Sequence, residues 1–185
     1  ARNATNQDAI GMINGANDFD GVLDGTNQYV HVNDDDSLDL YENGTLSAWI
    51  NLDSISNYDG IIHKGDLAGN FDDEAYGIYF WQNSYLRFVL MDENAPGEGY
   101  NLETQSPLQI NTWYHVVGTW NNTGRFFYIN GVLNASSSAV ETPRISTGGV
   151  NIGAQIVEDM GGTYGNLPAD GIIDEVRISK TYRNS

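Results

Sequence analysis

Short runs of alternating apolar and other side chains follow one another closely along the chain, separated by residues typical of turns. The run at 45–52 is the clearest, because Leu46, Ala48 and Ile50 recur at every second position. A period of two predicts a strand with one buried face. Similar runs predict further strands over residues 28–32, 60–63, 76–81, 85–91, 113–120, 125–129, 132–133, 150–152 and 172–178.

The segments between these runs predict tight turns. Residues 82–84 join two apolar runs as a hairpin turn, residues 121–124 form a second, and Asn130-Gly131 opens a third. No long window has the spacing of an amphipathic helix. Many short strands joined by Gly- and Asn-rich turns are typical of an antiparallel all-β sandwich or jelly roll.

Composition narrows the class of protein. With 185 residues, the sequence predicts a single domain over residues 1–185. The absence of cysteine excludes disulfides, thiolate metal sites and a cysteine nucleophile. The formal charge of -17 argues against nucleic acid and anionic membranes as partners. No apolar run is long enough to span a bilayer. No signal-peptide pattern opens the sequence, so Ala1 is expected to begin a mature or excised segment.

Several motifs together carry a family resemblance. The most specific is Trp113-Tyr-His-Val-Val-Gly-Thr-Trp120 followed by Phe127-Tyr-Ile-Asn-Gly131. With the motifs at 23–30, 44–50, 61–66, 151–153 and 171–178, it resembles concanavalin A-like, laminin G-type domains over residues 23–178. The resemblance implies an all-β fold, a jelly-roll β-sandwich of two antiparallel sheets, one of them concave. Such relatives are extracellular and often accompany catalytic domains of polysaccharide-degrading enzymes, or serve in adhesion.

The resemblance also implies a structural calcium ion near the first and last motifs. Asp24 and Asp174 are the candidate carboxylate ligands, and Asn27 and Gly25 offer an amide and a backbone oxygen. Many relatives carry Asp where this chain has Gln28, which weakens such a site or changes its geometry. The alternative is that Asp24 only shapes a turn with Gly25.

Enzymes of this fold provide a test for catalysis. Hydrolases need two carboxylates on one strand face, but Asp174 and Glu175 are adjacent and point to opposite faces. A lyase would need His, Tyr and an Arg or Gln on the concave face. His115 lies in a motif shared with non-catalytic relatives, and the turn after His63 also occurs in them. We therefore expect no catalytic residues.

The hairpin at 76–91 carries the candidate ligand-binding face. If Ile78 and Phe88 face the core, the alternating residues face outward, and these are Tyr79, Trp81, Tyr85, Arg87 and Val89. Aromatic rings with a guanidinium suit the apolar ring faces and hydroxyls of a sugar. The alternative is that another loop, such as residues 92–109, covers them.

Three further residues complete the candidate ligand-binding set. His63 and Lys64 lie in the turn motif of the family, where a structural role is the alternative, and Tyr164 lies in a Gly-rich loop that would form a rim. Trp49 and Trp113, in contrast, are expected in the core.

Together these features predict a non-catalytic carbohydrate-binding module of an extracellular protein, monomeric as an isolated module. Its partner would be a neutral or weakly charged polysaccharide or oligosaccharide. The alternatives are a calcium-dependent, protein-binding adhesion module of the laminin G type, a polysaccharide lyase or glycoside hydrolase of the same fold, and a spacer without a ligand.

Overall fold

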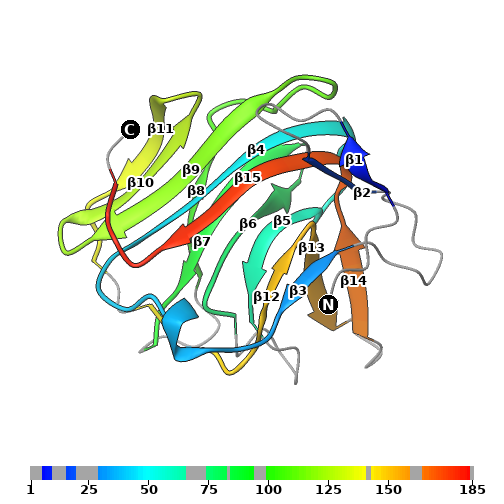
Figure 1. The fold of residues 1–185 in the computed structure, drawn as a ribbon. Coiled ribbons are helices and arrows are strands. Elements are labelled where there is room, and N and C mark those ends of the chain that lie inside the picture. The colour runs from blue at the N-terminus through cyan, green and yellow to red at the C-terminus, as the bar shows by residue number, and fades with distance from the viewer. Residues whose placement is uncertain are drawn as a thin grey trace.

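A computed structural model describes residues 6–9, 16–19, 29–65, 74–82, 84–93, 99–140, 143–158 and 164–183. Within them, one sheet, called sheet B, has seven strands in the order β1 (Asn6–Ala9), β2 (Ala16–Phe19), β15 (Asp170–Ser179), β4 (Gly44–Ser54), β9 (Tyr114–Asn121), β10 (Gly124–Ile129) and β11 (Val132–Ser137). In Figure 1 the red β15 lies beside the cyan β4, next to the blue N-terminal strands.

The described part of the second sheet, sheet A, has eight strands. Six of them follow the order β13 (Ala154–Glu158), β14 (Tyr164–Pro168), β5 (Gly60–Lys64), β6 (Tyr76–Trp81), β7 (Tyr85–Met91) and β8 (Gly99–Glu103). The remaining two are β12 (Val150–Ile152), which pairs with β5, and β3 (Val30–Val32), which pairs with β12. Neighbours pair antiparallel, apart from a parallel contact between β14 and β5. A short 3-10 turn, η1 (Asp36–Leu38), follows β3.

The core lies between the two sheets and is built by the alternation seen in the sequence. Leu46 and Ile50 of sheet B and Ile78 and Phe88 of sheet A belong to one buried cluster. Gly118 of β9 lets the sheets approach, because a Cβ atom there would lie 2.4 Å from the Phe88 ring. The predicted all-β, jelly-roll sandwich of two antiparallel sheets is therefore confirmed. No helix of the described residues has the length and apolar character needed to cross a membrane.

The tryptophans correct one expectation. Trp49 and Trp113 were expected in the core, but both are only partly buried, and their rings meet edge to face with centroids 6.4 Å apart. Trp49 alternates with the buried Ala48 and Ile50, so it lies on the outer face of sheet B. Trp120, in contrast, is 3% exposed and packs in the core.

Candidate functional site

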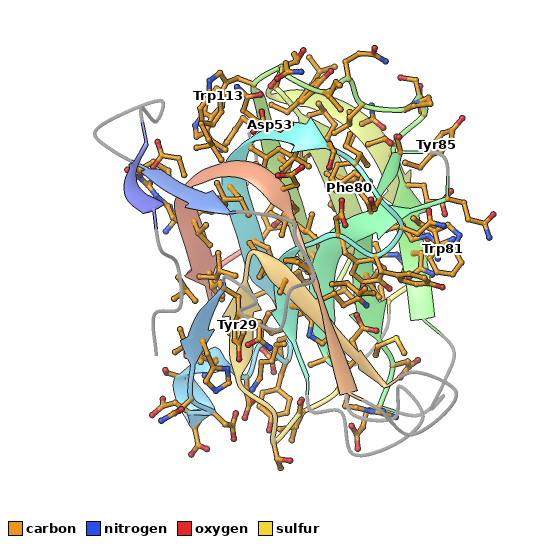
Figure 2. All side chains as sticks on the ribbon, turned by 90° about the vertical axis from the view of Figure 1, so that its right-hand side faces the viewer. Tyr29, Asp53, Phe80, Trp81, Tyr85 and Trp113 are labelled. Carbon is orange, nitrogen blue, oxygen red and sulfur yellow. The ribbon has the colours of Figure 1, made fainter. Side chains whose placement is uncertain are left out.

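The hairpin of β6 and β7 places aromatic side chains on the outer face of sheet A. Trp81 and Tyr85 lie directly opposite each other across the hairpin, and Arg87 lies two residues further on the same face. Figure 2 shows Trp81 and Tyr85 on one side of the molecule, away from Trp113. The side chains of Trp81, Tyr85 and Arg87 are partly exposed, so their predicted outward orientation is confirmed.

Neighbouring side chains hold Trp81 in place. The Arg87 guanidinium carbon lies 4.0 Å from the centroid of the Trp81 ring. The Tyr58 ring packs edge to face on the Trp81 ring, with the two centroids 4.8 Å apart. Arg87 Nε donates a hydrogen bond to Glu103 Oε1 on β8. Here the term aromatic patch means Tyr58, Trp81 and Tyr85 with the Arg87–Glu103 pair. Because Arg87 is balanced by Glu103, the patch presents ring surface with little net charge.

A buried polar cluster lies on the same outer face of sheet A, further along the strands from the aromatic patch. The register across sheet A aligns Asn151, His63 and Gly77 in one row. Gly77 leaves space above the sheet, since a Cβ atom there would lie 3.3 Å from Glu74 Oε1. Glu74 Oε1 is in turn 3.7 Å from His63 Nε2. The term polar cluster means five buried residues, each at most 6% exposed: His63, Glu74, Tyr79, Asn151 and Gln155.

Burial disfavours the charged forms of the titratable groups in the polar cluster. It lowers the pKa of His63 to about 4 and raises the pKa of Glu74 to about 7. The pKa of the Tyr79 hydroxyl lies well above its usual value, first because of burial and then because of the Glu74 charge. Between about pH 4 and 7 neither member of the His63–Glu74 pair carries a full charge. The pair is therefore a neutral contact rather than a salt bridge.

Tyr79 and His63 lie on the predicted face but are covered. Tyr79 packs with Val89 and Met91 in a small separate cluster on the outer side of sheet A. It is 6% exposed, so the expectation that it forms part of an open platform is wrong in that respect. His63 is 3% exposed, as its structural alternative predicts.

Lys64 points to the other side of its strand and serves an internal role. Its Nζ lies 2.6 Å from Asp34 Oδ1 and 3.5 Å from Asp39 Oδ1, and it donates to the backbone oxygens of Ser146 and Gly148. Lys64 is fully buried. The structure therefore separates Lys64 from the aromatic patch, and this side chain ties β5 to the segment that follows β3.

The remaining predicted residues lie apart from the patch. Tyr164 is the first residue of β14, paired with Glu158 of β13, and β5 separates that hairpin from β6. Of the expected calcium ligands, Asp24, Gly25 and Asn27 lie outside the described residues. Asp174 is 7% exposed, and its Oδ1 accepts a hydrogen bond from the Glu175 backbone nitrogen. Among the described residues, no group of three or more acidic or histidine side chains is placed to hold a metal ion.

Two members of the aromatic patch were not found from the sequence. Glu103 lies opposite Arg87 on β8, a strand that the sequence pattern did not predict. Tyr58 lies in the turn before β5, and its positive φ of 70° is unusual for a residue with a side chain. In the sequence, Tyr58 can be recognised only as an aromatic residue in a turn next to a predicted strand.

Two mainly antiparallel sheets packed face to face place this protein in the class of jelly-roll β-sandwiches. The comparison with family profiles identifies the family within that class. The chain belongs to the laminin G-type family of the concanavalin A-like lectin/glucanases superfamily, whose profile matches residues 5–185. No curated protein sequence matches the chain.

Solved structures with this fold include several sugar-binding domains. Domain 4 of AbnA, an extracellular GH43 arabinanase of Geobacillus stearothermophilus determined with arabinotriose, has a TM-score of 0.67 and 17% identity, with 92% of this chain and 72% of that chain covered. The CBM40 of a Ruminococcus gnavus IT-sialidase, bound to α2,3-sialyllactose, has a TM-score of 0.62 and 17% identity, with 77% and 78% covered.

A heptameric pentraxin matches to a similar extent. The heptameric SAP-like pentraxin of Limulus polyphemus has a TM-score of 0.63 and 18% identity, covering 90% of this chain and 76% of that chain. At these identities the similarity establishes the fold and leaves ligand and role to the residues of this chain.

Proposed function

We propose that this chain is a non-catalytic carbohydrate-binding module that holds a polysaccharide against the aromatic patch of sheet A. The observation that carries the proposal is the group of three partly exposed aromatic rings, Tyr58, Trp81 and Tyr85, held at one end of the outer face. Rings fixed in this way offer a stacking surface for sugar rings at low entropic cost. The sugar-binding domains among the structural neighbours support the same class of partner.

Charge favours a neutral polymer. The chain carries a formal charge of -17, so a uronic acid or sulfated polymer would be repelled over about 8 Å at physiological salt. The one guanidinium in the patch, that of Arg87, already pairs with Glu103. Neutral glycans meet no such penalty, and extracellular polysaccharide is the proposed target.

Burial argues for a binding role rather than a lyase role. The structure does bring together the residue types that a lyase would need, in His63, Tyr79 and Gln155. All three are at most 6% exposed, however, so a sugar ring has no access to their polar atoms in this arrangement. In this proposal they support the sheet beneath the glycan and carry out no chemistry.

Affinity electrophoresis of the isolated chain tests the proposal, with gels containing neutral arabinan, xylan or β-glucan and acidic pectin or alginate. We expect retardation in at least one neutral gel. Trp81→Ala should weaken binding by about 2 kcal/mol, or roughly thirtyfold in Kd, as for a central aromatic contact. Trp113→Ala, which removes a partly buried tryptophan just before β9 of the opposite sheet, is the matched control.

Three results would contradict this function. Retardation that Trp81→Ala leaves intact would place the glycan elsewhere. No retardation in any gel would favour a protein-binding or spacer role. Release of unsaturated or reducing sugar by the isolated chain would show catalysis.

A further inference from the structure

A pocket of about 710 Å³ lies over the ends of three neighbouring strands of sheet B. Its lining comes from residues 41–43, 121–122, 140 and 181–182. Three of these segments precede β4, end β9 and follow β15, and β4 lies between the other two strands; residue 140 follows β11. The pocket is therefore built by chain segments that the antiparallel register brings to the same end of the sandwich.

This pocket and the aromatic patch lie at opposite ends of the molecule. β4 begins at Gly44, next to the pocket residue Asn43, and ends at Ser54, four residues before Tyr58. Eleven residues of strand at about 3.3 Å each separate the two ends by roughly 30 Å. No residue is shared between them, so a ligand in the pocket would leave the patch open.

The lining has the chemistry that recognises a neutral sugar. Among the described lining residues, three carry amides, two are tyrosines, one is a threonine and one is a valine, with Glu42 as the one charged group. Amide and hydroxyl groups both donate and accept hydrogen bonds, as sugar hydroxyls do. The tyrosine rings, Tyr41 and Tyr182, supply apolar surface for a sugar ring face. None of the described lining residues is basic, and Glu42 would repel an anionic ligand.

Parts of the lining are held in place before any ligand arrives. The Tyr182 ring packs edge to face on Phe126 with centroids 5.9 Å apart. Asn121 Oδ1 accepts hydrogen bonds from the backbone nitrogen and the hydroxyl of Thr123, at 2.8 and 2.6 Å. The NH2 group of Asn121 is therefore the part of this amide left to contact a ligand. Tyr41, in contrast, is 45% exposed at the pocket wall.

We propose that this pocket is a second saccharide-binding site, which takes a neutral sugar unit independently of the aromatic patch. Two sites at opposite ends would let one module hold two segments of a polymer, or two chains of it. Where one polymer reaches both sites, the second contact is intramolecular and raises the overall affinity. The inference rests on the pocket lining alone and stands whether or not the patch binds.

The test is a titration followed by nitrogen-edited NMR, with glucose, galactose, mannose, xylose and arabinose as separate probes. The protein is produced in bacteria, because Asn43 and Asn121 each begin an Asn-x-Thr sequence that a eukaryotic host could glycosylate. We expect one or more sugars to shift the side-chain amide signals of Asn43, Asn121 and Asn122. A small ligand of this kind should bind in the millimolar range.

Variants then assign the shifts to the pocket. Tyr41→Ala should weaken the binding that these amides report by about tenfold, the loss of one stacking ring. Asn122→Ala, an exposed amide, provides a second variant if Tyr41→Ala lowers the melting temperature. Trp81→Ala should leave the pocket shifts unchanged, and so should Ile145→Ala, a matched exposed residue outside both sites.

The outcomes separate this inference from the proposed function. Pocket shifts that survive Trp81→Ala and fall with Tyr41→Ala support the second site, even if the patch binds nothing. Shifts confined to residues 58, 81 and 85 overturn the second site and leave the proposed function standing. Absence of amide shifts with all five sugars at tens of millimolar overturns it as well.

Discussion

Glu74→Gln should make the protein more stable at alkaline pH and change little at acidic pH. The glutamate is 4% exposed beside the neutral His63, and burial raises its pKa from 4.5 to about 7. In the unfolded chain Glu74 ionises near its ordinary pKa, whereas in the folded protein it keeps its proton until about pH 7. The contribution of Glu74 to the free energy of unfolding is therefore fully present below about pH 4.5 and is lost as the pH rises through about 7. Glutamine has nearly the same shape and never ionises, so it avoids this loss.

The magnitude follows from the size of the pKa shift. A shift of about 2.5 pH units, at 1.36 kcal/mol for each unit, corresponds to about 3 kcal/mol. The variant should thus exceed the wild type by about 3 kcal/mol well above pH 7. Below pH 4.5 the two proteins should differ only by the exchange of a carboxylic acid for an amide, which is a small effect of about 1 kcal/mol or less.

Urea unfolding followed by tryptophan fluorescence measures this difference, at about pH 5 and about pH 9 for both proteins. Asp53→Asn is the control, because it removes one negative charge from an exposed position of the same highly acidic chain. The control should gain the same small amount at both pH values. If the stability difference between Glu74→Gln and wild type is equal at the two pH values, Glu74 titrates normally and the argument from burial fails.

Three further predictions follow from the packing and the expected calcium ion. Lys64→Met should destabilise the protein by about 3 kcal/mol in urea unfolding, because two aspartates lose their buried cationic partner; an unchanged midpoint would contradict this role. Gly118→Ala should lower the free energy of unfolding by about 2 kcal/mol, because the added methyl group clashes with Phe88. Gly131→Ala meets no atom within 4 Å and should lower it by only about 1 kcal/mol, because of the positive φ at this position. Equal losses in the two variants would refute the packing argument. Calcium should raise the melting temperature and chelator should lower it, and Asp174→Asn should abolish the response; a wild-type melting curve indifferent to calcium would remove the expected ion.

Local alternation predicted the part of the fold that depends on neighbouring residues. It placed Ile78 and Phe88 inside and Trp81, Tyr85 and Arg87 outside, because strand pleating and a tight turn fix both faces of a hairpin. It also led to the sandwich architecture through the closely spaced strands. These predictions needed no knowledge of which strands pair across the sheet.

Coverage of the sheet faces could not be predicted in the same way. Tyr79 and His63 are buried together with Asn151 and Gln155, which lie some 70 to 90 residues later in the sequence. Likewise Trp49 was expected in the core because it lies within the family's strand motif, although its strand parity places it outside. Periodicity fixes the side of a strand on which a residue lies, whereas exposure depends on segments distant in the chain.

The position of β15 has a consequence for synthesis of the protein. β15 is the last described strand to leave the ribosome, yet it pairs with β4 on one side and β2 on the other. Before β15 is synthesised, β4 and β2 each have an unpaired edge with which strands of other chains can pair. Sheet B is therefore completed only once β15 has been synthesised, and until then the edges of β4 and β2 are sites at which aggregation can begin.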